Sequence, residues 1–238
     1  RGLVGSEMCI RDSANDGTIS IGILAGGGLS TIDAANTGTN TEALTLLSGS
    51  GAITVGEIGT LTNGALDTLD INATGSAAAA LTIQQIGLYG NDNLSSTGTA
   101  GVTGAANIGN AATASIDLSD TEFNFGGTTA ITAVGDVTSD ANIKIKTDDD
   151  LTITAGNSAT TGFKTTGAAK IFSLADKTLK IVGNIIGADS GTSNETIQFQ
   201  SGTNAGADDG TIDIAGNIGT QIESCLLYTS DAADDLLC

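Results

Sequence analysis

A short alternating phrase recurs along almost the whole chain: an apolar residue, any residue, and a second apolar residue. Each copy is bounded by Gly, Asn, Asp, Ser or Thr, the residue types that favour turns. The copies begin at Ile19, Leu44, Ile53, Leu69, Leu81, Ile116, Ile143, Leu151, Leu179, Ile197 and Ile212. Because period-two alternation with β-branched residues is typical of strands with one buried face, the sequence predicts short strands throughout.

The copies also share longer phrases, which indicates a repeat architecture. Asp-Gly-Thr-Ile begins at Asp16 and again at Asp209, and Leu-Thr-Ile begins at Leu81 and Leu151. In a β-solenoid, each coil contributes a few such strands and stacks on the next coil at ~4.8 Å. We therefore predict an all-β fold, a β-solenoid of the right-handed parallel β-helix type without caps of its own, with roughly 20 to 25 residues per coil.

The composition agrees with a thin interior. Aromatic residues make up only 3% of the chain and proline is absent. Proline cannot donate to a strand ladder, and a narrow core can be filled by Ile, Leu and Val. Residues 89–115 alternate less clearly and are rich in Gly, Ser, Thr and Asn. We expect a long loop or a loosely wound coil there.

The two ends of the chain differ from the rest. Residues 8–13 (MCIRDS) read as the translation of a sequencing-library adapter, and residues 225–230 (CLLYTS) as the translation of its reverse complement. We therefore expect residues 1–13 and 225–238 to be adapter-derived segments that pack poorly. Residues 14–224 are expected to form the solenoid, as an internal part of a longer protein. They contain no cysteine, since Cys9, Cys225 and Cys238 lie in the end segments.

The solenoid segment is strongly acidic. Residues 14–224 contain 22 Asp and Glu against six lysines, and no Arg or His. Such a chain repels phosphate backbones, so nucleic acid is not an expected partner. The chain also has no apolar run long enough for a transmembrane helix. The lysines are confined to one part of the chain, as Lys144, Lys146, Lys164, Lys170, Lys177 and Lys180; we interpret them as charge balance beside an acidic run, with a small anion-binding patch as the alternative.

Calcium binding is the metal chemistry that the acidic turns suggest, because Ca²⁺ accepts several carboxylate and carbonyl oxygens. The candidates are Asp148, Asp149, Asp150, Asp208, Asp209 and Asp213. No window matches a calcium-binding repeat or a complete EF-hand loop. We expect at most weak Ca²⁺ binding, no other cofactor, and solvated turn carboxylates that keep the protein soluble.

Catalysis is the second function class. β-Helices host polysaccharide lyases and hydrolases, so the alternative function is a carbohydrate-active β-helix enzyme. The lack of Arg and His removes the bases that such lyases generally use, and it excludes a Ser-His-Asp triad from residues 14–224. Asp208 and Asp209 form a carboxylate pair that would suit acid–base work, but carboxylates are common all along this chain. We therefore expect no catalytic residues and no enzyme activity.

Two phrases carry a family resemblance. Residues 135–143 (GDVTSDANI) and 149–156 (DDLTITAG) resemble the Gly-Asp-Val and Asp-Leu-Thr-Ile-Thr-Ala-Gly phrases of bacterial filamentous haemagglutinin-like exoproteins and autotransporter adhesins. The resemblance implies a β-helical passenger region, hence a structural and adhesive stalk that is secreted to the bacterial cell surface. The implied partner is a host or neighbouring-cell surface, or a glycan. The chain departs from these families in having no recognisable secretion domain, translocator barrel or Arg-Gly-Asp motif.

Overall fold

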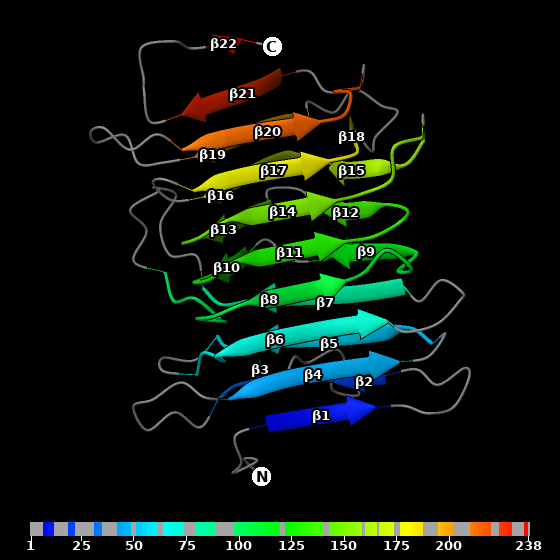
Figure 1. Ribbon diagram of the computed structural model, residues 1–238, viewed down its shortest axis with the longest axis vertical. Coiled ribbons are helices and arrows are strands. Elements are labelled where there is room, and N and C mark those ends of the chain that lie inside the picture. The colour runs from blue at the N-terminus through cyan, green and yellow to red at the C-terminus, as the bar shows by residue number, and fades with distance from the viewer. Residues whose placement is uncertain are drawn as a thin grey trace.

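A stack of parallel strands makes up the computed structural model of the chain. The structure describes residues 7–11, 19–21, 31–34, 42–48, 51–60, 64–73, 80–88, 98–119, 122–139, 143–158, 160–165, 167–173, 177–187, 195–201, 210–219, 224–229 and 236–237. These residues form strands and turns and contain no helix, so none of them belongs to a helix that could cross a membrane. The strands lie one above another from the N-terminal to the C-terminal end (Figure 1).

One sheet faces the viewer in Figure 1. Eight strands are described in it, and each pairs in parallel with its neighbours. In spatial order they are β1 (Glu7–Arg11), β4 (Ala43–Ser48), β6 (Thr68–Ala73), β8 (Ala106–Gly109), β11 (Thr129–Thr132), β14 (Leu151–Thr154), β17 (Thr178–Val182) and β20 (Thr211–Ala215). Spatial order follows sequence order, which is the mark of a coil that adds one strand to this face at each turn.

The second sheet lies behind the first and contains 14 described strands. They are β2 (Ile19–Ile21), β3 (Thr31–Ile32), β5 (Ile53–Ile58), β7 (Ala80–Ile86), β9 (Ser115–Leu118), β10 (Glu122–Phe125), β12 (Val137–Ser139), β13 (Ile143–Thr147), β15 (Gly162–Thr165), β16 (Ala168–Ser173), β18 (Asn184–Gly187), β19 (Thr196–Ser201), β21 (Ser224–Thr229) and β22 (Leu236–Leu237). Their pairings are parallel except β21 with β22.

The second sheet divides at β7. The first part of β7 pairs with β9, whereas Ile86 near its end pairs with Phe123 of β10. From β8 to β19, each coil contributes three strands, for example β11, β12 and β13. The chain crosses the front from left to right, returns behind and rises, so the coil is right-handed (Figure 1). The predicted parallel β-helix is therefore confirmed.

The coil length is less regular than predicted. Ile131 pairs with Ile108 in the coil below and with Ile153 in the coil above, and these two steps along the chain are nearly equal. The following steps, from Ile153 to Ile181 and from Ile181 to Ile214, are both longer. Since the strands stay in register, the additional residues lie in the connections between strands. Insertions in such surface connections cost little stability.

The core consists of columns of inward side chains, one from each coil. The front sheet supplies Leu46, Ile71, Ile108, Ile131, Ile153 and Ile181. The two parts of the second sheet supply Ile53, Leu81, Ile116, Val137, Phe163 and Ile185, and Ile58, Ile86, Phe123, Ile145, Ile171 and Phe199. All are fully buried. The predicted inward positions are thus confirmed, although Ile212 and Ile214 are only partly buried because β20 is the last strand described in its sheet.

The interior is not purely aliphatic. Phe123, Phe125, Phe163 and Phe199 are the largest fully buried side chains, so most of the five phenylalanines in the chain lie in the core. These rings add to the core of branched aliphatic residues that the composition indicates. A ring fits here because its neighbours in the adjacent coils are smaller, such as Val137 beside Phe163.

Part of the segment predicted as a loop belongs to the regular stack. Residues 106–109 form β8, which pairs with both β6 and β11. The alternation is weak in this stretch because one inward position holds the small Ala106. Residues 89–97 of the predicted loop lie outside the described residues.

Both ends contribute backbone to the stack. Residues 7–11 pair in register with β4, and residues 224–229 pair with β19. The backbone of these residues thus extends the two sheets, while the adapter-derived character of the ends stays a prediction. Open strand edges accept almost any strand-forming segment, so this pairing needs no sequence fitted to the coil.

The alternation of buried and outward residues gives a direct test. Ile153→Asp should lower the free energy of unfolding by about 3 kcal/mol or more, because an unpaired carboxylate would enter a dry core. Thr152→Asp, one residue away on the outer face beside Lys180, should cost less than about 1 kcal/mol. Urea denaturation of both variants measures the difference. Equal costs would contradict the inward assignment.

Candidate functional site

The predicted calcium residues of the acidic run do not form a cage. Asp148, Asp149 and Asp150 lie in the turn between β13 and β14, and each carboxylate meets a different partner. Asp148 Oδ1 lies 2.8 Å from Lys146 Nζ. Asp150 Oδ1 accepts a 2.7 Å hydrogen bond from the backbone N–H of Thr178. The triplet therefore ties strands and coils together.

Asp149 joins three successive coils. Its Oδ2 accepts a 2.9 Å hydrogen bond from Thr128 Oγ1 in the coil below. Its Oδ1 lies 2.7 Å from Lys177 Nζ in the coil above. The hydrogen bond from Lys177, followed by that from Thr128, lowers the pKa of the Asp149 carboxyl below its ordinary value of 3.8. Asp149 therefore links the coil below to the coil above through a hydrogen bond and an ion pair, and we call this arrangement an electrostatic staple.

Of the remaining calcium candidates, Asp213 lies in the described part of the chain. Asp213 lies in β20, where its Oδ2 is 2.9 Å from Lys180 Nζ. Asp208 and Asp209 lie outside the described residues. In the part of the chain that the structure describes, no three His, Cys, Asp or Glu side chains gather as a metal site would require.

Asp70 shows the opposite electrostatic behaviour. It lies in β6 on the outer side of the front sheet, between Thr45 and Asn107 in register. Its Oδ1 atom is buried without a hydrogen-bond partner, and burial raises the pKa of this carboxyl. Charge on Asp70 therefore opposes folding, whereas charge on Asp149 favours it.

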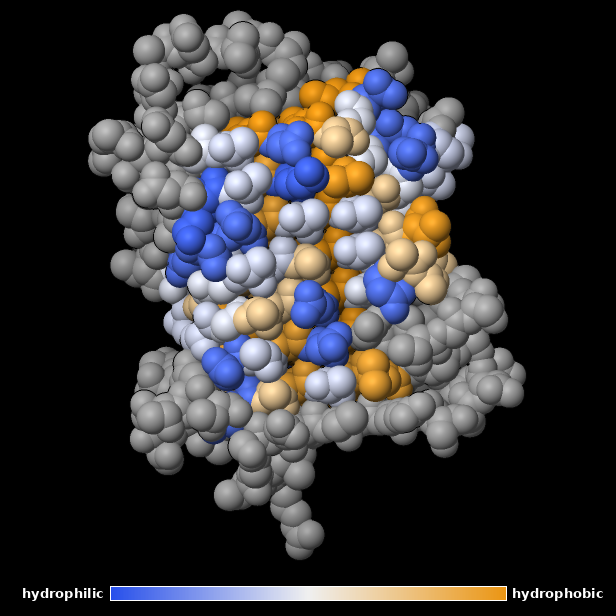
Figure 2. Space-filling model, in the orientation of Figure 1, coloured by the Kyte–Doolittle hydropathy of each residue, from blue (hydrophilic) through white to orange (hydrophobic). Residues whose placement is uncertain are grey.

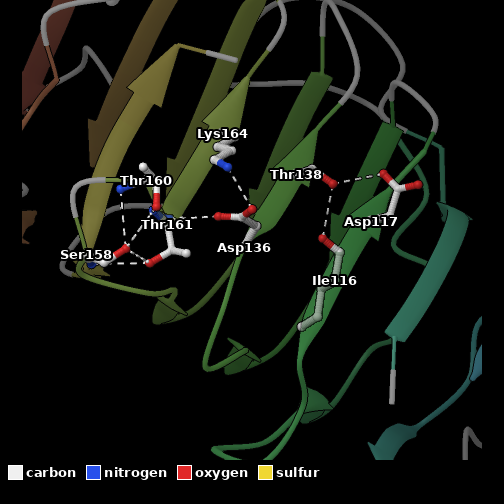
Figure 3. Close-up of polar contacts among 9 residues, drawn as sticks. Ile116, Asp117, Asp136, Thr138, Ser158, Thr160, Thr161 and Lys164 are labelled. Atoms are coloured by element: carbon white, nitrogen blue, oxygen red, sulfur yellow. Dashed lines mark hydrogen bonds and ion pairs between the residues drawn. The ribbon is translucent and has the colours of Figure 1, made fainter. Parts of the chain in front are cut away.

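A second polar cluster covers the face formed by β9, β12 and β15 (Figure 3). Asp136 Oδ2 accepts a 2.7 Å charged hydrogen bond from Lys164 Nζ, and its Oδ1 accepts one from the Gly162 N–H at 3.0 Å. On the neighbouring strand pair, Thr138 Oγ1 lies 3.1 Å from Asp117 Oδ1. These contacts again link one coil to the next.

Among the described residues, the hydroxyl group at the corner of this face contacts other hydroxyl and backbone N–H groups. Ser158 Oγ lies 2.7 Å from Thr161 Oγ1 and accepts the backbone N–H of Thr160 and of Thr161 (Figure 3). This arrangement closes the turn between β14 and β15, as Ser and Thr commonly do in turns. A nucleophilic serine would instead need a hydrogen-bonded base.

Two of the lysines balance the acidic run at residues 148–150, as the sequence predicted, and two others pair with acids elsewhere. Lys146, Lys164, Lys177 and Lys180 each form an ion pair with an Asp carboxylate. The side chain of Lys170 lies outside the described residues. Sequence analysis identified the lysine group but missed Asp136 and Asp117, since isolated acids in turns and strands carry no recognisable motif.

A shallow groove opens where β11, β14 and β17 end. Its cavity volume is about 340 Å³, and its lining includes Thr132, Thr154, Val182 and Asn157. Val134, also in the lining, is 62% exposed. Figure 2 shows the front sheet as a surface on which hydrophobic residues appear between polar ones. The groove forms because the ends of three strands from successive coils lie side by side. The sequence alone does not indicate that these strand ends are neighbours.

Comparison with known proteins adds no assignment. No protein-family model, curated protein or solved structure matches the chain.

The staple at Asp149 predicts a pH dependence. Because its native pKa is below that of the unfolded chain, its contribution to stability is complete above the unfolded pKa and is lost as pH falls through the native one. Thermal unfolding between about pH 5 and pH 2 should show a steeper loss of Tm for the parent chain than for Asp149→Asn. Parallel pH profiles would show that the contact contributes nothing.

The same geometry predicts how the protein responds to calcium. At constant ionic strength, replacing Mg²⁺ by Ca²⁺ should leave the Tm unchanged, because lysine ammonium and backbone N–H groups already occupy the carboxylates of the triplet. A specific site would raise the Tm by mass action. A rise with Ca²⁺ alone that Asp149→Ala removes would establish a calcium site.

Proposed function

We propose that this chain is a structural and adhesive stalk segment of a secreted bacterial cell-surface protein. The observation that carries the proposal is the continuity of the stack. Front-sheet strands pair coil by coil from β4 to β20, and buried columns accompany them. In a solenoid each coil contacts only its neighbours, so stiffness depends on how tightly successive coils are joined.

The joints between coils are reinforced at their corners. Thr147, Ser173 and Ser201 are fully buried hydroxyl residues at equivalent positions of β13, β16 and β19. Ser173 Oγ donates to Ser201 Oγ at 3.0 Å, and Ser201 Oγ lies 2.7 Å from the Lys177 carbonyl oxygen. Satisfied buried polar contacts of this kind fix one register. These contacts support a mechanical role, in which the stack must keep its shape when it is pulled.

The groove at the ends of β11, β14 and β17 is the adhesive surface that we assign. Its hydroxyl groups, Thr132 and Thr154, and the Asn157 amide can hydrogen-bond to a sugar, while Val134 and Val182 offer apolar contact to sugar C–H groups. The partner is therefore a glycan on a host or neighbouring cell. No described contact favours the enzyme alternative, whose carboxylate pair Asp208 and Asp209 lies outside the described residues.

Binding to immobilised glycans and to intact cells tests this function. Val134→Glu should weaken glycan binding about tenfold, equivalent to roughly 1.4 kcal/mol, because it places a charge in the groove. Leu88→Glu is the matched control, since Leu88 is also exposed (39%) but does not line the groove. Absence of binding by the parent chain, or equal losses in both variants, would contradict the proposal.

A further inference from the structure

Two polar side chains are buried side by side on the outer surface of the second sheet. Asn124 of β10 and Lys146 of β13 are partners in register on adjacent parallel strands. Both alternate with inward residues and so point outward, yet Asn124 is fully buried and Lys146 is only 5% exposed. Buried lysine is rare unless it is paired, so this position calls for an explanation.

The side-chain amide of Asn124 forms a hydrogen bond through its nitrogen but none through its oxygen. Its Nδ2 donates a 2.8 Å hydrogen bond to the Leu88 carbonyl oxygen, and its own backbone carbonyl accepts the Gly101 N–H at 2.9 Å. The Leu88 and Thr99 backbones pair across the same bend. The Oδ1 atom remains buried without a hydrogen-bond partner, which leaves the amide carbonyl available to a new donor.

A carboxylate stands beside the lysine amine. Lys146 Nζ lies 2.8 Å from Asp148 Oδ1, and that oxygen is itself buried. The two groups are close enough to form an ion pair, but their orientation does not meet the angle of a hydrogen bond. Adjacent strands are separated by about 5 Å. A lysine side chain is long enough to span this separation, so the Lys146 amine can reach the side-chain amide carbon of Asn124.

We propose that Lys146 and Asn124 form an intramolecular isopeptide bond between two successive coils. Lys146 transfers a proton from its ammonium group to Asp148, and the neutral amine attacks Cγ of Asn124. The Nζ–Cγ bond forms and the Cγ–Nδ2 bond breaks. A second proton of Nζ passes to Nδ2, which leaves as ammonia, and one proton stays on Nζ in the new amide. The proton held by Asp148 then converts the ammonia to ammonium. The reaction needs no oxidant, reductant or cofactor.

The bond would link two successive coils covalently. It would link β10 to β13 on the outer face, beside the buried Thr147 and Phe125 contacts of the same strand pair. The proposal stands on the chemistry of these three side chains and does not depend on the adhesive role.

Intact-mass spectrometry of the purified full chain tests the proposal. The parent chain should be lighter than its sequence mass by one ammonia. Proteolysis followed by tandem mass spectrometry should yield one branched peptide that contains both Asn124 and Lys146. The parent chain itself provides the test, so the result does not depend on the folding of any variant. A full sequence mass without a branched peptide would overturn the proposal.

Variants separate the cross-link from other losses of ammonia. Lys146→Arg and Asn124→Ala should restore the unmodified mass of each chain, whereas Lys144→Arg, the neighbouring lysine of the same strand, should leave the ammonia loss intact. Asp148→Ala should slow the reaction at least tenfold. A succinimide at Asn124 would also lose ammonia, but it would persist in Lys146→Arg, and that result would overturn the cross-link.

Discussion

The parallel hydrogen-bond ladder between successive coils is the constraint on which the rest of the structure depends. A parallel ladder fixes the register of each strand against the strand one coil away. Ile108, Ile131 and Ile153 therefore lie directly above one another, although a whole coil of sequence separates each from the next. A slip of one residue would turn a whole column outward, so the inward columns and the ladder stabilise each other.

The ladder also decides how charge is arranged. Outward side chains one coil apart lie within reach of each other, so Lys180 meets Asp213, and Lys164 meets Asp136 of the preceding coil. Although the formal net charge is −19, lysines lie beside carboxylates where the coils need joining. Asp149 is the clearest example, because Thr128 and Lys177 hold it from opposite sides. Asp70, buried with one oxygen unpaired, shows the cost of a carboxylate that lacks such partners.

The site was less predictable than the fold. The acidic run at residues 148–150 was visible in the sequence, but a run of carboxylates suits a metal cage and a set of staples equally well. The choice depends on Lys177 and Thr178, which are distant from the run in sequence and arrive from the next coil. The buried pair Asn124 and Lys146 is similar: alternation places both residues on the outer face, and only the packing around Leu88 and Gly101 shows that Asn124 is covered.

By itself, the sequence determined the strand type, the inward residues and the stacked architecture, because period-two alternation and repeated phrases are local properties. It also determined the pairing of lysines with acids in general terms. Only the tertiary structure decided which coil lies on which, since connections of varying length break the repeat while the ladder keeps its register. It likewise decided the division of the second sheet at β7, the burial of four phenylalanines, and the partners of Asp149 and Lys146. These features depend on contacts between residues more than a coil apart or on local packing, which no single stretch of sequence encodes.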